Sequence, residues 1–192
     1  MDTPKKNYVR NLTLAAMFLA IGLLLPIFTG QIKQIGSMLL PMHIPVILCG
    51  LICGWQYGLG VGFILPLLRS AIFGMPILFP TGISMAFELA AYGFVVGFLY
   101  SHSRWKCVVA LYRCMIIAML SGRIVWGIVQ TILLGLGENG FTFSAFIAGA
   151  FLNAIPGIIL QLTLIPAIMI ALNKTGLVRF SNNRAPAENT EN

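Results

Sequence analysis

Long apolar runs alternate along the chain with short breaks that are polar or contain Pro and Gly. These runs predict helical spans at about residues 10–29, 43–55, 57–74, 82–101, 107–135 and 145–173. A helix needs about 20 residues to cross the hydrocarbon core, and the second run is short by that measure. The run from Leu12 to Ile27 is apolar on both alternating faces, which argues against a transmembrane strand. The pattern therefore predicts an all-α integral membrane protein with six transmembrane helices.

Composition agrees with a chain that lies in lipid. Hydrophobic residues make up 58% of the sequence and charged residues only 9%, which does not suit a soluble domain. We expect a cytoplasmic N-terminal segment (1–9), a six-helix membrane domain (10–175) and a disordered cytoplasmic tail (176–192). Little of the chain is left for a soluble catalytic domain, so we expect its function to lie within the bilayer.

Basic residues predict the orientation of the chain, because cytoplasmic flanks of membrane helices retain Lys and Arg. They precede the first span, separate the fourth from the fifth, and follow the last: Lys5, Lys6, Arg10, Arg104, Lys106, Lys174, Arg179 and Arg184. Six spans with both termini in the cytoplasm satisfy this distribution. The net charge of +7 is then mostly a topology signal, and we expect no nucleic-acid partner.

The sequence carries no common signature of an enzyme. It has no phosphate-binding Gly-Lys-Ser/Thr motif, no His-Glu-x-x-His zinc motif and no Gly-x-Ser-x-Gly elbow, and its histidines are His43 and His102. The four cysteines lack zinc-knuckle spacing, so we interpret them as buried thiols. We predict neither catalysis nor a cofactor nor a metal. A stand-alone secondary transporter or small channel stays open as an alternative.

Three ionisable residues, Arg69, Glu88 and Arg123, lie inside or beside the apolar runs. Charges in a bilayer are costly and are usually retained for function. Three predicted spans also carry polar or small residues at helical spacing: Thr81, Ser84, Glu88 and Tyr92; Arg123, Trp126 and Gln130; Gly149, Asn153, Gly157 and Gln161. We expect these stripes to converge on a cavity.

The predicted substrate-binding residues come from these stripes and from the outer loops. They are Arg69, Glu88, Tyr92, Arg123, Trp126, Gln130, Asn153 and His43. One Glu cannot neutralise two Arg, so the surplus guanidinium favours a ligand with an anionic group. In the alternative interpretation, Glu88 forms a structural ion pair with Arg69 or Arg123. His43 could also simply be a helix-start residue, and the connection 73–81 is a plausible lid.

Small residues recur at four-residue spacing in the first three spans. Ala16 and Ala20 form such a step, as do Gly50, Gly54 and Gly58. This spacing lets helix backbones approach closely. It predicts either packing within the chain or a surface for a partner subunit.

The sequence resembles the substrate-binding S components of energy-coupling factor (ECF) transporters, which are bacterial vitamin importers. The resemblance covers about residues 8–175. It rests on six spans in under 200 residues with the N-terminus inside, on Ala16-x-x-x-Ala20, and on two further segments: Pro41 to Val46 running into Cys49 to Gly54, and Leu67 to Ser70 through Met85 to Glu88.

This resemblance implies a multi-pass subunit of the bacterial cytoplasmic membrane that captures a vitamin-like micronutrient from outside. A transmembrane coupling subunit and two ATPase subunits would drive the uptake, and Ala16 and Ala20 match the positions that contact the coupling subunit in the family. Pantothenate fits an anionic ligand. Riboflavin would shift weight to the aromatic residues, and a thiamine-like cation would shift it to Glu88.

Overall fold

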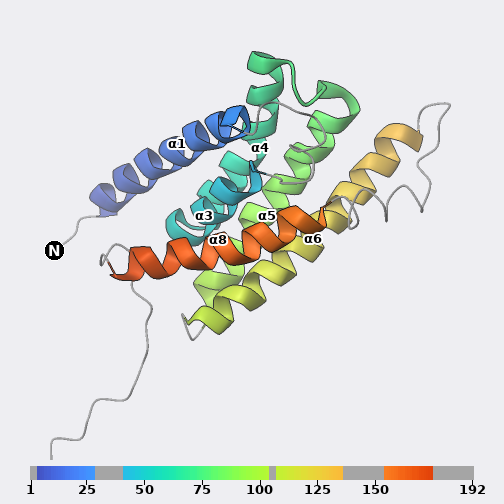
Figure 1. Ribbon diagram of the computed structural model, residues 1–192. Coiled ribbons are helices and arrows are strands. Elements are labelled where there is room, and N and C mark those ends of the chain that lie inside the picture. The colour runs from blue at the N-terminus through green and yellow to red at the C-terminus, as the bar shows by residue number, and fades with distance from the viewer. Residues whose placement is uncertain (1–3, 29–40, 104–106, 136–153, 175–192) are drawn as a thin grey trace, which may run out of the picture.

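The computed structural model describes residues 4–28, 41–103, 107–135 and 154–174. Its helices are α1 (Pro4–Phe28), α3 (His43–Cys53), α4 (Trp55–Phe73), α5 (Ile83–His102), α6 (Val108–Gly135) and α8 (Ile155–Lys174), and the short helical turn η1 (Leu78–Gly82) precedes α5. These elements form a helical bundle (Figure 1) and no strand occurs in the described ranges. The predicted all-α class is confirmed.

Five of these helical segments are long and apolar enough to cross a membrane: Tyr8–Ile27, Trp55–Phe73, Leu78–His102, Val108–Gly135 and Ile155–Lys174. The sixth, α3, is apolar but has only 11 residues, as the short second run suggested. Within the described residues, each predicted span therefore corresponds to one helix, although α1 begins six residues earlier than expected. The start of the last predicted span and the tail 176–192 lie outside the described residues. The cytoplasmic placement of both termini stays a prediction.

The short helix α3 forms the centre of the bundle. All of its residues except Ile52 are buried, and it contacts α1, α4, α5 and α8. The surrounding helices instead expose large apolar side chains, such as Leu24 of α1 and Ile124 of α6, which are 53% and 58% exposed. An apolar exterior of this kind suits contact with lipid tails. Polar groups of the central helix are consequently screened from lipid by its neighbours.

Glycines bring three backbones together around α3. A Cβ atom added to Gly50 would lie 2.6 Å from the carbonyl oxygen of Gly93, and one added to Gly58 would lie 2.7 Å from the same oxygen. Helices α3, α4 and α5 thus meet where no side chain would fit. The predicted packing role of Gly50 and Gly58 is confirmed. Gly54 instead adopts φ +101° in the single-residue link between α3 and α4.

Candidate functional site

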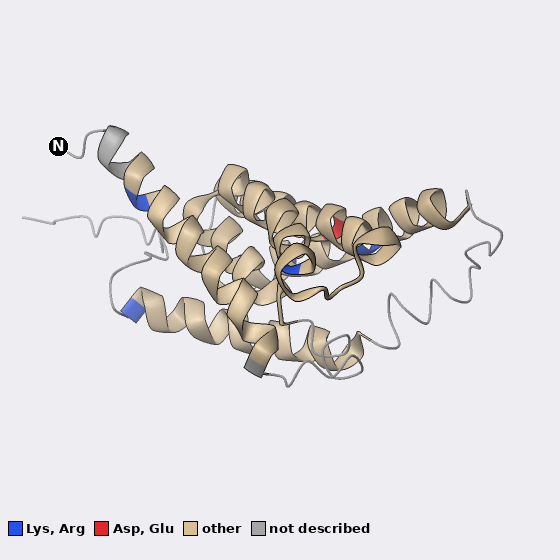
Figure 2. Ribbon diagram, turned by 90° about the horizontal axis from the view of Figure 1, so that it is seen from above, with Lys and Arg blue, Asp and Glu red and all other residues tan. Residues whose placement is uncertain are grey.

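A buried cluster of ionisable side chains joins three helices at the centre of the bundle. Nη1 of Arg123 on α6 lies 3.0 Å from Oε1 of Glu88 on α5, and Nε2 of His43 on α3 lies 3.6 Å from the same oxygen. All three residues are at most 5% exposed. Figure 2 shows the acidic position within the bundle beside a basic one. Of the two ion pairs that the sequence left open, the structure forms the one between Glu88 and Arg123.

Helix packing explains why these residues meet. Tyr92 lies one turn after Glu88 on α5, is 1% exposed, and interacts with the Glu88 carboxylate through its hydroxyl. Its ring contacts the His43 ring edge-on, with centroids 5.1 Å apart. On the α6 side, Gly122 leaves room for this ring, because a Cβ atom there would lie 2.8 Å from Tyr92. His43, Glu88, Tyr92 and Arg123 therefore form one assembly, which we call the central polar cluster.

Several polar atoms on α3, α5, α6 and α8 are buried without a hydrogen-bond partner in the described part of the chain. They are Nδ1 and Nε2 of His43, Nε and Nη2 of Arg123, Oε1 of Gln130 and Nε2 of Gln161. Glu88 Oε1 also lacks an aligned hydrogen bond, so its contact with Arg123 is chiefly one of charge. Buried polar groups are normally satisfied, and leaving one unmade costs about 1–3 kcal/mol. The unmet donors and acceptors of His43, Glu88 and Arg123, which lie together, are typical of a ligand or water site.

The orientation of Arg123 gives this region its chemistry. Its Nη1 faces Glu88, whereas Nε and Nη2 have no partner among the described residues. These last two nitrogens form one edge of the planar guanidinium, and a guanidinium edge binds both oxygens of a carboxylate or phosphate. The ion pair with Glu88 thus leaves Arg123 able to bind an anionic group.

Arg69 lies apart from the central polar cluster. Its Nε donates to the carbonyl oxygen of Met75 at 3.1 Å, and its Nη1 donates to that of Leu23 at 3.4 Å. The guanidinium carbon also lies 5.7 Å from the centre of the Phe73 ring. Arg69 is 5% exposed and connects α4, the loop after it and α1. Its pairing with Glu88 is excluded, and its role in ligand binding stays a prediction.

The remaining predicted binding residues have different settings. Gln130 is buried on α6, two turns beyond Arg123, and Trp126 between them is partly buried. Asn153 lies outside the described residues. Gln161 of α8 is 1% exposed and was missing from the predicted set, although it belongs to the same four-residue stripe as Asn153. That spacing was the signal that could have identified it.

The features predicted outside this region have simpler settings. Cys49, Cys53 and Cys114 are buried free thiols, as expected, and Cys107 is partly exposed. The described residues contain no group of three His, Cys, Asp or Glu side chains that could hold a metal ion.

On α1, Ala16 and Ala20 are both exposed, between the exposed residues Leu12 and Leu24. This face therefore presents two small residues flanked by two large ones.

Comparison with known proteins identifies the chain. Residues 10–171 match the family model described as "ECF transporter, substrate-specific component". Searches of curated proteins and of solved structures gave no match. The match spans most of the chain, including every residue of the central polar cluster. This membrane protein therefore belongs to the family of ECF transporter substrate-specific components.

Proposed function

We propose that this chain captures a small, water-soluble nutrient with an anionic group, and that separate coupling and ATPase subunits drive its uptake with ATP. Membership of the family makes the chain a substrate-specific membrane subunit rather than an enzyme. The observation that carries the finer proposal is the unpartnered Nε and Nη2 edge of Arg123, buried beside Glu88. A carboxylate of the ligand would satisfy that edge.

Other side chains of the bundle would supply the further contacts that such a ligand needs. Gln130 and Gln161 offer a buried acceptor and a buried donor to polar groups of the ligand. Tyr92 and Trp126 offer ring surfaces against its body, and His43 offers a further ring nitrogen. Asn153 is a further hydrogen-bonding candidate from the sequence. Pantothenate, with one carboxylate and several hydrogen-bonding groups, is the vitamin that we would test first.

We assign the coupling subunit to the exposed face of α1. Ala16 and Ala20 are exposed there, and Leu12 and Leu24 flank them at the same four-residue spacing. Small residues allow a partner helix to approach the backbone closely, and lipid-exposed leucines can pack beside it. This face lies on α1, whereas the residues of the central polar cluster lie on α3, α5 and α6, so docking and ligand binding would use different side chains.

A secondary transporter is the second candidate. Its support is the placement of His43 3.6 Å from Glu88, since chains of His and acidic residues within membranes can relay protons. In that case a proton gradient, rather than partner ATPases, would drive uptake by the chain alone.

Reconstitution separates the two candidates. The purified chain should show an increased melting temperature with one member of a vitamin panel that includes pantothenate, in the absence of ATP, because a ligand that binds only the folded state stabilises it. Vesicles with the chain alone should not accumulate that vitamin, whereas vesicles that also contain coupling and ATPase subunits should do so with ATP. Gradient-driven uptake by the chain alone would overturn the proposal.

A further inference from the structure

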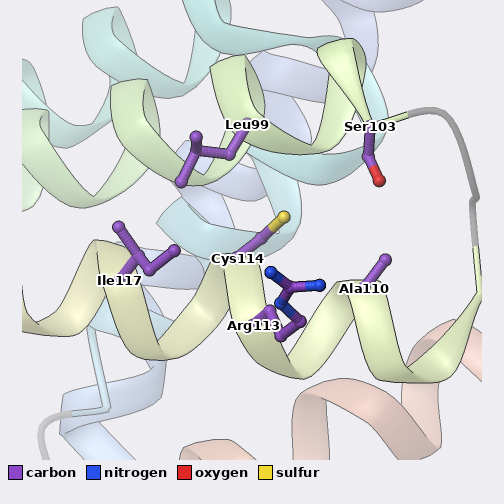
Figure 3. Close-up of a pocket in the computed structure, with 6 residues that line it drawn as sticks. All are labelled: Leu99, Ser103, Ala110, Arg113, Cys114 and Ile117. Atoms are coloured by element: carbon purple, nitrogen blue, oxygen red, sulfur yellow. The ribbon is translucent and has the colours of Figure 1, made fainter.

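A second polar feature lies between α5 and α6, at the end of the bundle where α5 ends and α6 begins. A hollow of about 220 Å³ is lined by Leu99, Ser103, Ala110, Arg113, Cys114 and Ile117. Figure 3 shows the Arg113 guanidinium lying in this hollow, with the Ser103 hydroxyl directed from the end of α5 toward α6. None of these residues belongs to the central polar cluster.

Arg113 has no acidic partner within the described ranges. Glu88 is the one carboxylate side chain there, and it contacts Arg123. Arg113 is exposed and lies five residues after the start of α6, about 7.5 Å along the helix axis. An Arg this close to the end of a membrane helix can extend its guanidinium to the level of the lipid headgroups.

The surroundings of the hollow are those of a lipid-facing surface. The neighbouring residues Val109, Ile116 and Leu120 of α6 are 67%, 47% and 50% exposed. Leu99 and Ile117 give the hollow an apolar wall on the side away from Ser103 and Ala110. A cationic and hydroxyl-bearing rim over an apolar wall matches a phospholipid, with its phosphate at the rim and the start of an acyl chain along the wall. The volume of the hollow is below the roughly 300–1,000 Å³ of a pocket for a drug-sized molecule.

We propose that this hollow binds the phosphate headgroup of an anionic phospholipid through Arg113. By the predicted orientation, this lipid belongs to the cytoplasmic leaflet. A free phosphate ion could make the same contact with the Arg113 guanidinium as the lipid phosphate. The apolar wall of the hollow favours the lipid, because only the lipid has an acyl chain to lie along it. The proposal is independent of the ligand that the central polar cluster binds.

Lipid retention on the purified chain tests the proposal. Native mass spectrometry of the full chain, after exchange into micelles with equal amounts of phosphatidylglycerol and phosphatidylcholine, should show preferential retention of phosphatidylglycerol. Arg113→Gln should reduce that retention about fivefold, the effect expected for one basic residue near a membrane surface. Arg113→Lys should retain most of it. Arg10→Gln is the matched control, because Arg10 is also exposed near the predicted cytoplasmic end but does not line the hollow.

Two further arms distinguish the sources of phosphate and guard against misfolding. Inorganic phosphate added at the lipid concentration should not displace phosphatidylglycerol; complete displacement would show a site for a soluble anion and overturn the proposal. Ile117→Trp should reduce retention of phosphatidylglycerol, because the larger side chain would fill the space beside the apolar wall without removing a charge. Equal retention of both lipids by the unaltered chain, or equal losses in Arg113→Gln and Arg10→Gln, would also overturn it.

Discussion

Arg123 and Glu88 place Nη1 and Oε1 3.0 Å apart with side chains only 6% and 3% exposed, so this ion pair lies inside the bundle rather than at a surface. A buried pair has lost most of its hydration, and its two charges depend on each other. The same pair orients the free edge of Arg123. We therefore expect the relationship to matter for both stability and binding.

Removing one partner of this pair should be worse than removing both. We expect Glu88→Leu to lower the free energy of unfolding by about 3–5 kcal/mol, because Arg123 would be left as an uncompensated buried charge. Glu88→Leu combined with Arg123→Leu should recover much of that loss. Reversible unfolding in mixed micelles with increasing dodecyl sulfate would measure the two single variants, Glu88→Leu and Arg123→Leu, and the double variant. A double variant whose loss equals the sum of the single losses would contradict a coupled pair.

Arg123 and Arg69 should differ in their effect on ligand affinity. Arg123→Lys should weaken binding of the carboxylate vitamin found in the thermal-shift panel about 10- to 100-fold, since Lys cannot reproduce a two-nitrogen edge. Arg69→Lys should have a smaller effect, because the Arg69 donors face the carbonyl oxygens of Met75 and Leu23. Titration calorimetry on folded variants would decide. If Arg69→Ala and Arg123→Ala both bind normally, no arginine holds the anion.

Arg69 should instead control the loop that follows α4. Its hydrogen bond to Met75 fixes residues 74–77 against the end of the helix, so Arg69→Ala should increase amide exchange there several-fold. Exchange in α3, at the centre of the bundle, should change little. Hydrogen exchange followed by mass spectrometry gives both values, with Arg10→Ala as the control for loss of charge. Uniformly faster exchange would indicate global destabilisation instead.

Gly122 should affect the central polar cluster through shape alone. A Cβ atom at Gly122 would lie 2.8 Å from the Tyr92 ring, so Gly122→Ala should displace that ring and lower stability by roughly 1–3 kcal/mol. Gly60→Ala in α4 is the matched control, since a Cβ there meets nothing within 4 Å. Comparison of the two unfolding free energies tests this. Equal effects would mean that Tyr92 is not held as described.

The exposed face of α1 should matter for assembly but not for ligand affinity. Ala16→Trp and Ala20→Trp should each prevent co-purification with the coupling subunit, because a large side chain would block close approach of a partner helix. Met17→Trp, on a neighbouring exposed face of the same helix, should be tolerated. Normal assembly of both Ala variants would place the docking surface elsewhere. Thermal shift with the vitamin should be unchanged in all three variants.

The sequence by itself determined that this protein lies in a membrane and that its described spans are helices. Apolar runs of about 20 residues and few charges leave no stable alternative to helices in a bilayer, because backbone groups in lipid must be satisfied within each segment. The short second run likewise showed in advance that α3 would be the exception. The stripe of Glu88 and Tyr92 followed from helical periodicity alone.

Only the tertiary structure decided which polar residues meet. Periodicity places residues on a face of one helix but does not fix how neighbouring helices are rotated or shifted, so the sequence could not choose between Arg69 and Arg123 as the partner of Glu88. Close packing at Gly50, Gly58 and Gly93 sets that arrangement and brings His43 to the cluster. Arg69 donates to the carbonyl oxygens of Leu23 and Met75 instead, because the Glu88 carboxylate lies with Arg123.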